Sequence, residues 1–277
     1  ILACSAMRAW SPFDLGQAVR RAKRLAATKG SGFRVGWREN NTGTQGVAVR
    51  AKVIEYTSGW PRYVSSTEAG GVTQSRHPDP ALCKSGACFD EIMLSGLADE
   101  LRTIEQDTAI VFHQMGSHGP AYSQRYPDRF EDFKPVCRTT ELGRCSREEI
   151  VNAYDNSIRY TDHNLAEQIR LLTAMSGQAD SLLLYASDHG ESLGEKGLYL
   201  HGAPYFMAPE EQTRVPFLLW MSDGYRKRFS ISADCLQGKR SAALSHDNIY
   251  HTVIGGLGLS NDLYDASRDI LAKCRAD

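Results

Sequence analysis

The sequence has little that would suit a nucleic acid or a membrane span. Its net charge is -1, and its one basic patch is short, at positions 20–24, so composition does not favour a nucleic-acid partner. Its longest apolar stretches, such as 215–221, fall far short of the roughly 20 residues that cross a bilayer. The first residues lack the basic and apolar segments of a secretory signal. Either targeting information lies upstream of residue 1 or the protein is cytosolic.

The length and composition predict a folded globular protein. The chain has 277 residues, of which 42% are hydrophobic and 23% are charged, which is enough for one large core or two modest ones. It contains no internal repeat and no low-complexity linker. We therefore expect a single domain over residues 1–277.

The seven cysteines are spaced as local pairs and contain no C-x-x-C motif. In an oxidising compartment, cysteines spaced in this way close as disulfides, whereas in the cytosol they stay reduced. We predict an oxidising compartment, the alternative being seven unrelated thiols. The expected pairs are Cys83 with Cys88, Cys137 with Cys145 and Cys235 with Cys274, with Cys4 left over.

Short apolar runs alternate with amphipathic segments, which is typical of an α/β fold with a mostly parallel sheet covered by helices. A capping box, Ser146 with Glu149, opens the second of the expected helices, whose length invites a break near Thr161. The expected strands are 33–37, 108–114, 181–187 and 215–220, and the expected helices are 89–106, 146–176 and 247–256.

Histidines gather where two of these strands end. The expected strand 181–187 is followed by Asp188 and His189, with His201 twelve residues after His189. The expected strand 108–114 contains His113 and is followed by His118. Open α/β sheets place their sites at the carboxyl ends of strands, and carboxylate with imidazole is a ligand set that suits zinc. A single histidine beside glycine is more often a turn residue or a cap, but two such clusters favour a metal site.

The other histidines carry weaker signals. His77 lies in a proline-rich loop, His163 on a polar helical segment, and His246 and His251 bracket the start of a helix. His246 could cap that helix or contact a ligand, and we favour capping.

A longer pattern resembles a known family. The run from Ser187 to Pro204 resembles the zinc motif of the lipid A phosphoethanolamine transferases, which include the mobile colistin-resistance enzymes. The segments 113–122, 152–156 and 37–46 resemble further blocks of the same family. The resemblance covers about residue 33 to the C-terminus. It implies an alkaline phosphatase/sulfatase-like α/β/α sandwich, a location at the periplasmic face of the inner membrane, and a transmembrane anchor upstream.

The resemblance also implies roles for individual residues. Zinc is expected on Asp188 and His189, and a second zinc or the incoming phosphate groups on His201, His118 and His113. The segment that contains Asn41, Thr42 and Gln45 resembles the family's substrate pocket, although Gln45 replaces a lysine common at that position.

In the family, a threonine attacks the phosphorus of phosphatidylethanolamine, diacylglycerol leaves, and a lipid A phosphate then takes the phosphoethanolamine group. This transfer confers resistance to polymyxins. The family's early Gly-Glu-Ser motif and its Cys-Gly-Thr segment with the nucleophile are not found here, and Ser5 is a weak substitute. We expect the N-terminal part to be missing or altered, and the chain as given to be inactive.

Two alternatives stay open at this point. One is a phosphatase-like or sulfatase-like hydrolase of the same superfamily, although the sulfatase motif Cys-x-Pro-x-Arg is absent. The other is a zinc-binding remnant without catalytic activity.

Overall fold

The computed structural model describes residues 2–8, 34–40, 52–55, 73–75, 80–84 and 87–276. Helices and strands both occur throughout this part of the chain, so the predicted α/β class is confirmed. The chain forms two compact units. The first unit consists of Ile1–Leu25 and Ile169–Asp277, and the second of Ala26–Gln168.

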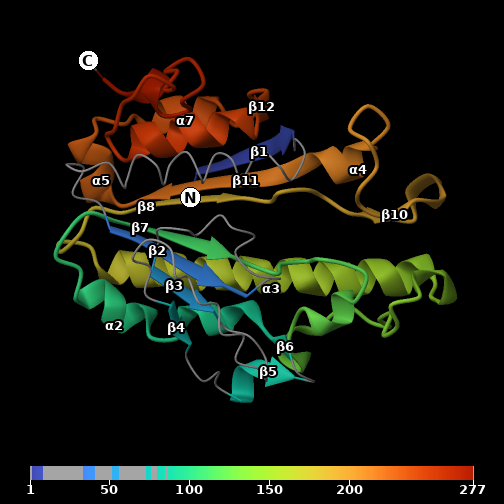
Figure 1. Ribbon diagram of the computed structural model, residues 1–277. Helices are drawn as coiled ribbons and strands as arrows, with labels where there is room; N and C mark the ends of the chain where they lie inside the picture. Colours follow the sequence, from blue (N-terminus) through green and yellow to red (C-terminus); the bar gives the residue numbers. More distant parts are fainter. Residues whose placement is uncertain are drawn as a thin grey trace. The chain divides into compact units, whose positions relative to one another are not determined.

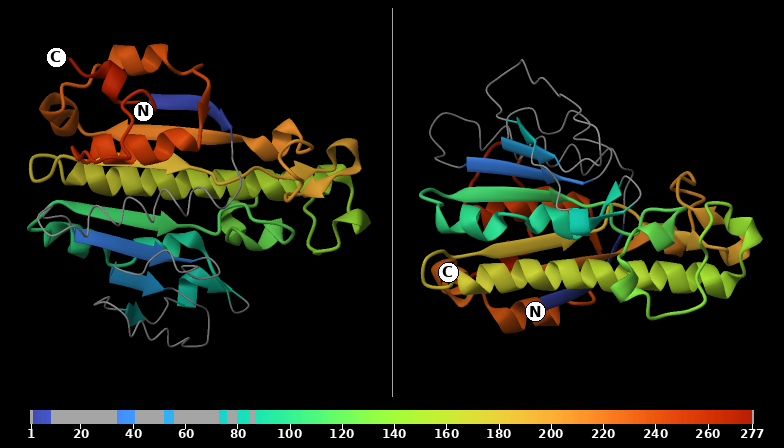
Figure 2. Two further views of the ribbon diagram at one scale, coloured as in Figure 1. Left: turned by 45° about the horizontal axis from the view of Figure 1, so that its top comes forward. Right: turned by 90° about the horizontal axis from the view of Figure 1, so that it is seen from below.

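The second unit contains a four-stranded parallel sheet (Figures 1 and 2). Its strands β2 and β7 pair in parallel register, from Arg34 beside Thr108 to Glu39 beside His113. Because parallel strands end at the same edge, Asn40 follows β2 beside the end of β7 and its amide donates to the His113 carbonyl at 3.1 Å. The strand order is β4 (Thr73–Ser75), β3 (Lys52–Glu55), β2 (Arg34–Glu39) and β7 (Thr108–His113).

One predicted helix of this unit, 89–106, is wrong in its continuity. The structure has a 3₁₀ helix η2 (Asp90–Leu94) and a separate α-helix α2 (Leu97–Arg102). Gly96 between them has φ of 67°, a left-handed backbone that ends regular helical geometry. The shorter elements of the unit are η1 (Pro80–Leu82), β5 (Cys83–Lys84), β6 (Ala87–Cys88), η3 (Tyr122–Gln124), η4 (Asp128–Phe130) and η5 (Leu142–Arg144).

The long helix α3 (Arg147–Ala174) begins with the predicted capping box. The Ser146 amide donates to Glu149 Oε2 at 2.7 Å, and the Glu149 amide donates to Ser146 Oγ at 3.2 Å. The break expected near Thr161 does not occur, because a buried face continues through Tyr160, Thr161 and Asn164. In the part of the chain that the structure describes, no helix combines the length and the apolar character that a membrane span requires.

The first unit contains a second four-stranded sheet (Figures 1 and 2). Here β11 runs antiparallel to both β1 and β8, so the parallel pairing expected from the sequence holds in the sheet of the second unit and between β1 and β12. The order is β12 (Leu244–Ser245), β1 (Leu2–Arg8), β11 (Arg214–Met221) and β8 (Leu182–Ala186).

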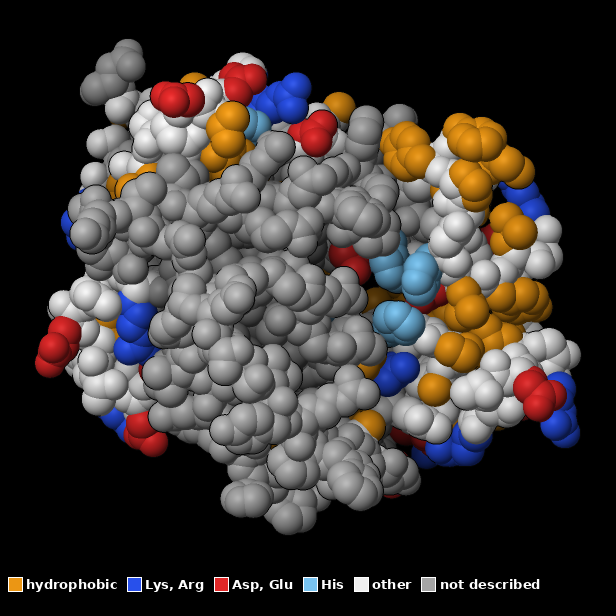
Figure 3. Space-filling view, viewed as in Figure 1, with side chains coloured by type: hydrophobic (Ala, Val, Ile, Leu, Met, Phe, Trp, Pro, Cys, Tyr) orange, Lys and Arg blue, Asp and Glu red, His pale blue; other side chains and the backbone are white. Residues whose placement is uncertain are grey.

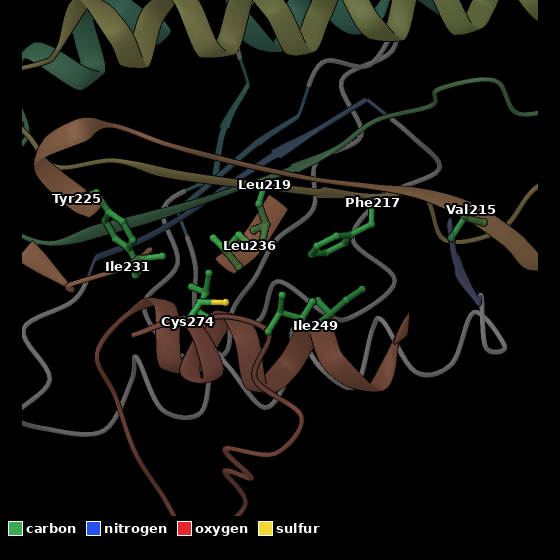
Figure 4. Close-up of a cluster of buried hydrophobic side chains, with 10 residues drawn as sticks. Val215, Phe217, Leu219, Tyr225, Ile231, Leu236, Ile249 and Cys274 are labelled. Carbon is green, nitrogen blue, oxygen red and sulfur yellow. The ribbon is translucent and has the colours of Figure 1, made fainter. Parts of the chain in front are cut away.

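The core of this unit forms against β11 (Figure 4). Val215, Phe217 and Leu219 alternate along the strand and are at most 2% exposed, as expected for residues on one face of a sheet. They pack in one cluster with side chains of α7 (Asp247–Gly256), whose predicted bounds 247–256 are confirmed. The remaining elements are β9 (Ser192–Leu193), η6 (Glu195–Gly197), β10 (Tyr199–Leu200), α4 (Glu210–Thr213), α5 (Asp223–Arg228), α6 (Ala233–Gly238) and η7 (Ala272–Cys274).

All three predicted disulfides are present. One closes the β5–β6 hairpin, one closes the loop before α3, and one joins α6 to η7. Each removes conformational freedom from the unfolded chain and so stabilises the folded state. The pairs are Cys83–Cys88, Cys137–Cys145 and Cys235–Cys274.

Helix α7 also carries a histidine that links stability to pH. His251 is 8% exposed, and its Nδ1 accepts a hydrogen bond from the Asp265 amide at 3.0 Å. Burial lowers the pKa of His251 from its ordinary value. The folded state therefore binds fewer protons here than the unfolded state does. This stabilising contribution is present above about pH 6.5 and is lost as pH falls through the folded-state pKa.

We expect His251→Gln to reduce the loss of unfolding free energy between about pH 7.5 and 5. The measurement is urea denaturation of the wild type and the variant across that range. Equal pH slopes for the two proteins would contradict this assignment.

Candidate metal centre

The turn after β8 is held by its own polar side chains. Ser187 Oγ donates to the His189 carbonyl at 2.8 Å, and Asp188 Oδ1 accepts the His189 amide at 3.0 Å. These short-range bonds replace the strand ladder as the backbone leaves the sheet. The turn therefore places Asp188 and His189 at the carboxyl end of β8, as the sequence predicts.

Gly190 is required by a close backbone approach. A Cβ atom at this position would lie 2.0 Å from the Glu211 carbonyl oxygen. Because glycine has no side chain, the two backbones come close enough for the Gly190 amide to donate to the Gln212 carbonyl at 2.9 Å. The Gln212 side chain donates from Nε2 to Ser192 Oγ at 2.9 Å, so the segment before β11 fixes the turn that carries the histidine.

Three side chains converge beyond this turn. His189, Glu191 and His201 each offer a ligand atom, and these atoms all lie within 4.8 Å of one another. The two imidazole rings stack with centroids 3.7 Å apart, while the Glu191 side chain is only 3% exposed. Two imidazoles with a carboxylate are a donor set found at catalytic metal sites. The group could therefore hold a metal ion.

The structure adds Glu191 to the residues expected from the sequence. It brings His189 and His201 together as predicted, and Glu191 Oε1 lies 3.1 Å from His201 Nδ1. The sequence signal was present, because Glu191 is a carboxylate two residues after His189 on the same glycine turn. It was overlooked because its burial and its partner depend on the return of the chain at His201.

Asp188 lies beside this cluster. Its side chain is 47% exposed, and Oδ2 lies 3.8 Å from His189 Nε2. Its role as a metal ligand stays a prediction.

Hydrogen bonds define which nitrogen of each histidine carries a proton. Nδ1 of His189 lies 3.0 Å from the Gly190 carbonyl, and Nδ1 of His118 lies 2.7 Å from the Gly119 carbonyl. A carbonyl oxygen only accepts, so Nδ1 must donate. In the neutral ring, Nε2 then carries the lone pair that binds metal ions. Glu191 holds His201 in the same tautomer.

The contact with Glu191 also favours the protonated form of His201. The hydrogen bond from the ring to Glu191 raises the pKa of His201, burial opposes this shift, and the charges of Glu191 and Asp188 add to it. The site is therefore electronegative, which suits a bound cation.

His246 does not cap α7 with its side chain, so that prediction is wrong. No side-chain capping bond is formed, and the buried ring instead donates from Nε2 to the Ser187 carbonyl at 2.9 Å. Near the start of the helix, Asn248 Oδ1 accepts the Ser245 amide at 2.9 Å. This bond places His246 against the residue that follows β8, where it supports the turn of Ser187.

In the second unit, a buried carboxylate holds the loop that carries the other predicted histidines. Asp90 is 5% exposed and accepts hydrogen bonds from the amides of Met115 at 2.9 Å and Gly116 at 2.7 Å. These amides lie between His113 and His118 in sequence. Asp90 also accepts from Asn40 Nδ2 at 2.8 Å. Burial raises the pKa of Asp90, and the three hydrogen bonds oppose this shift.

Asn40, which donates to Asp90, is the last described residue before a predicted substrate segment. Asn40 directly precedes the predicted substrate residues Asn41, Thr42 and Gln45, which lie outside the described residues. Ser5 belongs to strand β1. Its role as a substitute nucleophile stays a prediction.

Comparison with known proteins places these features in a family context. The sulfatase family model matches residues 25–259. The chain is 39% identical over 246 residues to phosphoethanolamine transferase EptA of Escherichia coli, covering 88% of this chain and 42% of that protein. It is 39% identical over 193 residues to phosphatidylethanolamine transferase Mcr-1 of Escherichia coli, covering 68% of this chain and 33% of that protein. The chain thus spans less than half the length of these curated relatives.

A solved structure agrees with these sequence matches. The soluble domain of lipooligosaccharide phosphoethanolamine transferase A from Neisseria meningitidis superposes with a TM-score of 0.77 and is 36% identical, covering 89% of this chain and 69% of that one. The predicted sulfatase-like α/β fold is confirmed.

We expect Glu191→Gln to weaken binding of a divalent ion, tested with Zn²⁺, by about tenfold or more. The substitution removes the charge of a carboxylate that is both a candidate ligand and the partner of His201. Competition with a chelating dye measures the affinity. The matched control is Glu210→Gln, which alters a carboxylate that is 71% exposed and paired with Arg214. Equal affinities for wild type and Glu191→Gln would remove Glu191 from the site.

We expect Asp90→Asn to destabilise the protein by about 1–3 kcal/mol, because an amide nitrogen would face donors that now bind a carboxylate. Hydrogen exchange at Met115 and Gly116 should accelerate with it. Asp99→Asn is the control, since Asp99 forms an exposed pair with Arg102 on one helix, which contributes little. Unchanged exchange at both amides would show that Asp90 does not hold the loop.

Proposed function

Because the chain belongs to the sulfatase family and, within it, to the lipid A phosphoethanolamine transferases, we propose that it transfers phosphoethanolamine from phosphatidylethanolamine to the phosphate groups of lipid A with the help of zinc. Since the chain spans less than half of its curated relatives, its substrates are inferred from the site and the family. The observation that carries the proposal is the cluster of His189, Glu191 and His201.

The donor set suits zinc. Imidazole and carboxylate are common ligands of catalytic zinc, and the Nδ1 hydrogen bonds to Gly190 and Glu191 orient the two rings with Nε2 as the ligand atom. Asp188 and His189 would hold the ion, and His201 would hold it or a second one. When bound, zinc neutralises phosphate charge and lowers the pKa of an oxygen nucleophile.

The chain's own residues would then position the phosphate groups. We assign His113 and His118 to the incoming and departing phosphate oxygens, where a histidine Nε2 can accept or return a proton. Asp90 keeps their loop in place through Met115 and Gly116. Asn41, Thr42 and Gln45 would bind the headgroup, with Gln45 offering an amide in place of a charge.

The disulfides support a location at the periplasmic face of the inner membrane. Disulfides persist in oxidising compartments such as the bacterial periplasm, and the described part of the chain contains three. Both lipid substrates are accessible there. The transferred group carries one ionised phosphate oxygen and one ammonium, and its attachment uses an ionisable oxygen of the lipid A phosphate. The net negative charge therefore falls, which weakens attraction of polycationic polymyxins. We therefore propose that the transfer confers polymyxin and colistin resistance.

The test is transfer in vitro with zinc, fluorescent phosphatidylethanolamine and lipid A. The 277-residue chain is compared with one extended upstream by a family-type Cys-Gly-Thr segment. We expect the extended protein to release diacylglycerol and to add phosphoethanolamine to lipid A, at least about 10³-fold faster than the shorter chain, because loss of a nucleophile costs orders of magnitude in rate.

Three outcomes would change the assignment. Diacylglycerol release without modification of lipid A would identify a hydrolase. Zinc binding without turnover by either protein would identify a remnant without catalytic activity. Turnover by the 277-residue chain that Ser5→Ala abolishes would make Ser5 the nucleophile.

A further inference from the structure

Large apolar side chains are exposed on the segment that follows the candidate metal site of His189, Glu191 and His201. Among the residues that the structure describes, five of the eight most exposed large apolar side chains fall between positions 198 and 207. Phe206 is 86% exposed, Met207 67% and Tyr205 46%. Figure 3 shows apolar side chains gathered over the segment between β10 and α4. We call residues 204–208 the apolar loop.

Hydrogen bonds hold this loop in an outward-facing turn. The amides of Met207 and Ala208 both donate to the Pro204 carbonyl, at 2.7 and 2.8 Å. On the far side, the Gln212 amide and the Thr213 hydroxyl donate to the Pro209 carbonyl, at 3.0 and 3.2 Å. The backbone therefore holds the apolar side chains of this loop in contact with water. Such exposure is unfavourable, and a binding partner that covers these side chains would remove the unfavourable contact.

The loop is continuous with the candidate metal cluster. His201 lies three residues before Pro204, and the Ala203 amide between them donates to Gln212 Oε1 at 3.4 Å. The same Gln212 fixes the glycine turn that carries His189, through the Gly190 amide. A surface that binds the loop is thereby brought close to the cluster.

The chemistry of the loop indicates a zwitterionic lipid surface. Aromatic side chains with one polar end favour the interface of a bilayer. Positions 201–213 contain no lysine or arginine and carry Glu210 and Glu211, so attraction to anionic headgroups does not explain the exposed side chains. The relative Mcr-1 is a phosphatidylethanolamine transferase by name, and phosphatidylethanolamine is a zwitterionic bilayer lipid.

We propose that the apolar loop inserts Phe206 and Met207 into a phosphatidylethanolamine bilayer and so holds the metal cluster at the lipid surface. The inference rests on the proposed function, because it names where the donor headgroup is taken up. Insertion of the loop removes apolar surface from water without a requirement for charge. Binding should therefore depend little on salt.

The first test is cosedimentation of the 277-residue chain with vesicles of phosphatidylethanolamine and phosphatidylcholine. We expect the wild type to bind and the double variant Phe206→Ser with Met207→Ser to bind at least about tenfold less. The matched control is Leu263→Ser, which removes an apolar side chain that is 58% exposed elsewhere in the same unit. Zinc affinity should be equal in all three proteins, which shows that the site is intact.

A second test measures insertion directly. A Phe206→Trp variant should gain fluorescence that brominated lipids quench, beyond the quenching seen for the four native tryptophans. Absence of vesicle binding by the wild type, equal binding by the double variant, or no added quenching would overturn the proposal. Binding that high salt abolishes would do the same, since it would indicate an electrostatic contact. Vesicle binding needs no turnover. Failure of the transfer assay can therefore be distinguished from failure of the loop to bind lipid.

Discussion

One kind of hydrogen bond recurs at the predicted histidines of each unit, from Nδ1 to an oxygen that can only accept. His118 and His189 meet the carbonyl of the next residue in the chain, and His201 meets the buried carboxylate of Glu191. When the ring is neutral, each bond keeps the proton on Nδ1 and leaves the lone pair on Nε2. Ring orientation and chemical role are thereby determined together, before any ion is bound.

The acceptor oxygens are in turn held by the strands and turns that precede them. Gly190 permits a backbone approach that no larger residue allows, and Gln212 connects this turn to the segment before β11. His246 supports the end of β8 from the start of α7. In the second unit, Asp90 does the same for the loop from His113 to His118 by taking two of its amides. Buried polar groups whose hydrogen bonds are satisfied can hold such loops rigidly.

An exposed apolar loop beside a polar cluster is costly for a protein that contacts only water. Its presence makes sense when the substrate is itself a lipid, since the donor headgroup then lies at the boundary between water and hydrocarbon. If the proposed function holds, the candidate metal site and the apolar loop would serve the two ends of one substrate. The fold accommodates both on the stretch between β8 and α4.

Local patterns in the sequence were sufficient for several features. Apolar runs bounded by turn residues predicted β7, β8 and β11, because strand formation here follows burial of short segments. The spacing of the cysteines predicted all three disulfides, and Ser146 with Glu149 predicted the start of α3. The break at Gly96 was missed because a glycine inside a helical pattern is often tolerated, and the pattern does not show that its φ is left-handed.

The sequence by itself determined the residue types of the site and their positions at strand ends, because these follow from motifs contained in one continuous segment. Only the tertiary structure decided which groups act together. Glu191 joins His201 because the chain returns through the β9–β10 hairpin. His246 donates to the Ser187 carbonyl 59 residues away, and Asp90 reaches Met115 across separate elements. Contacts between residues distant in sequence depend on packing, which no local pattern encodes.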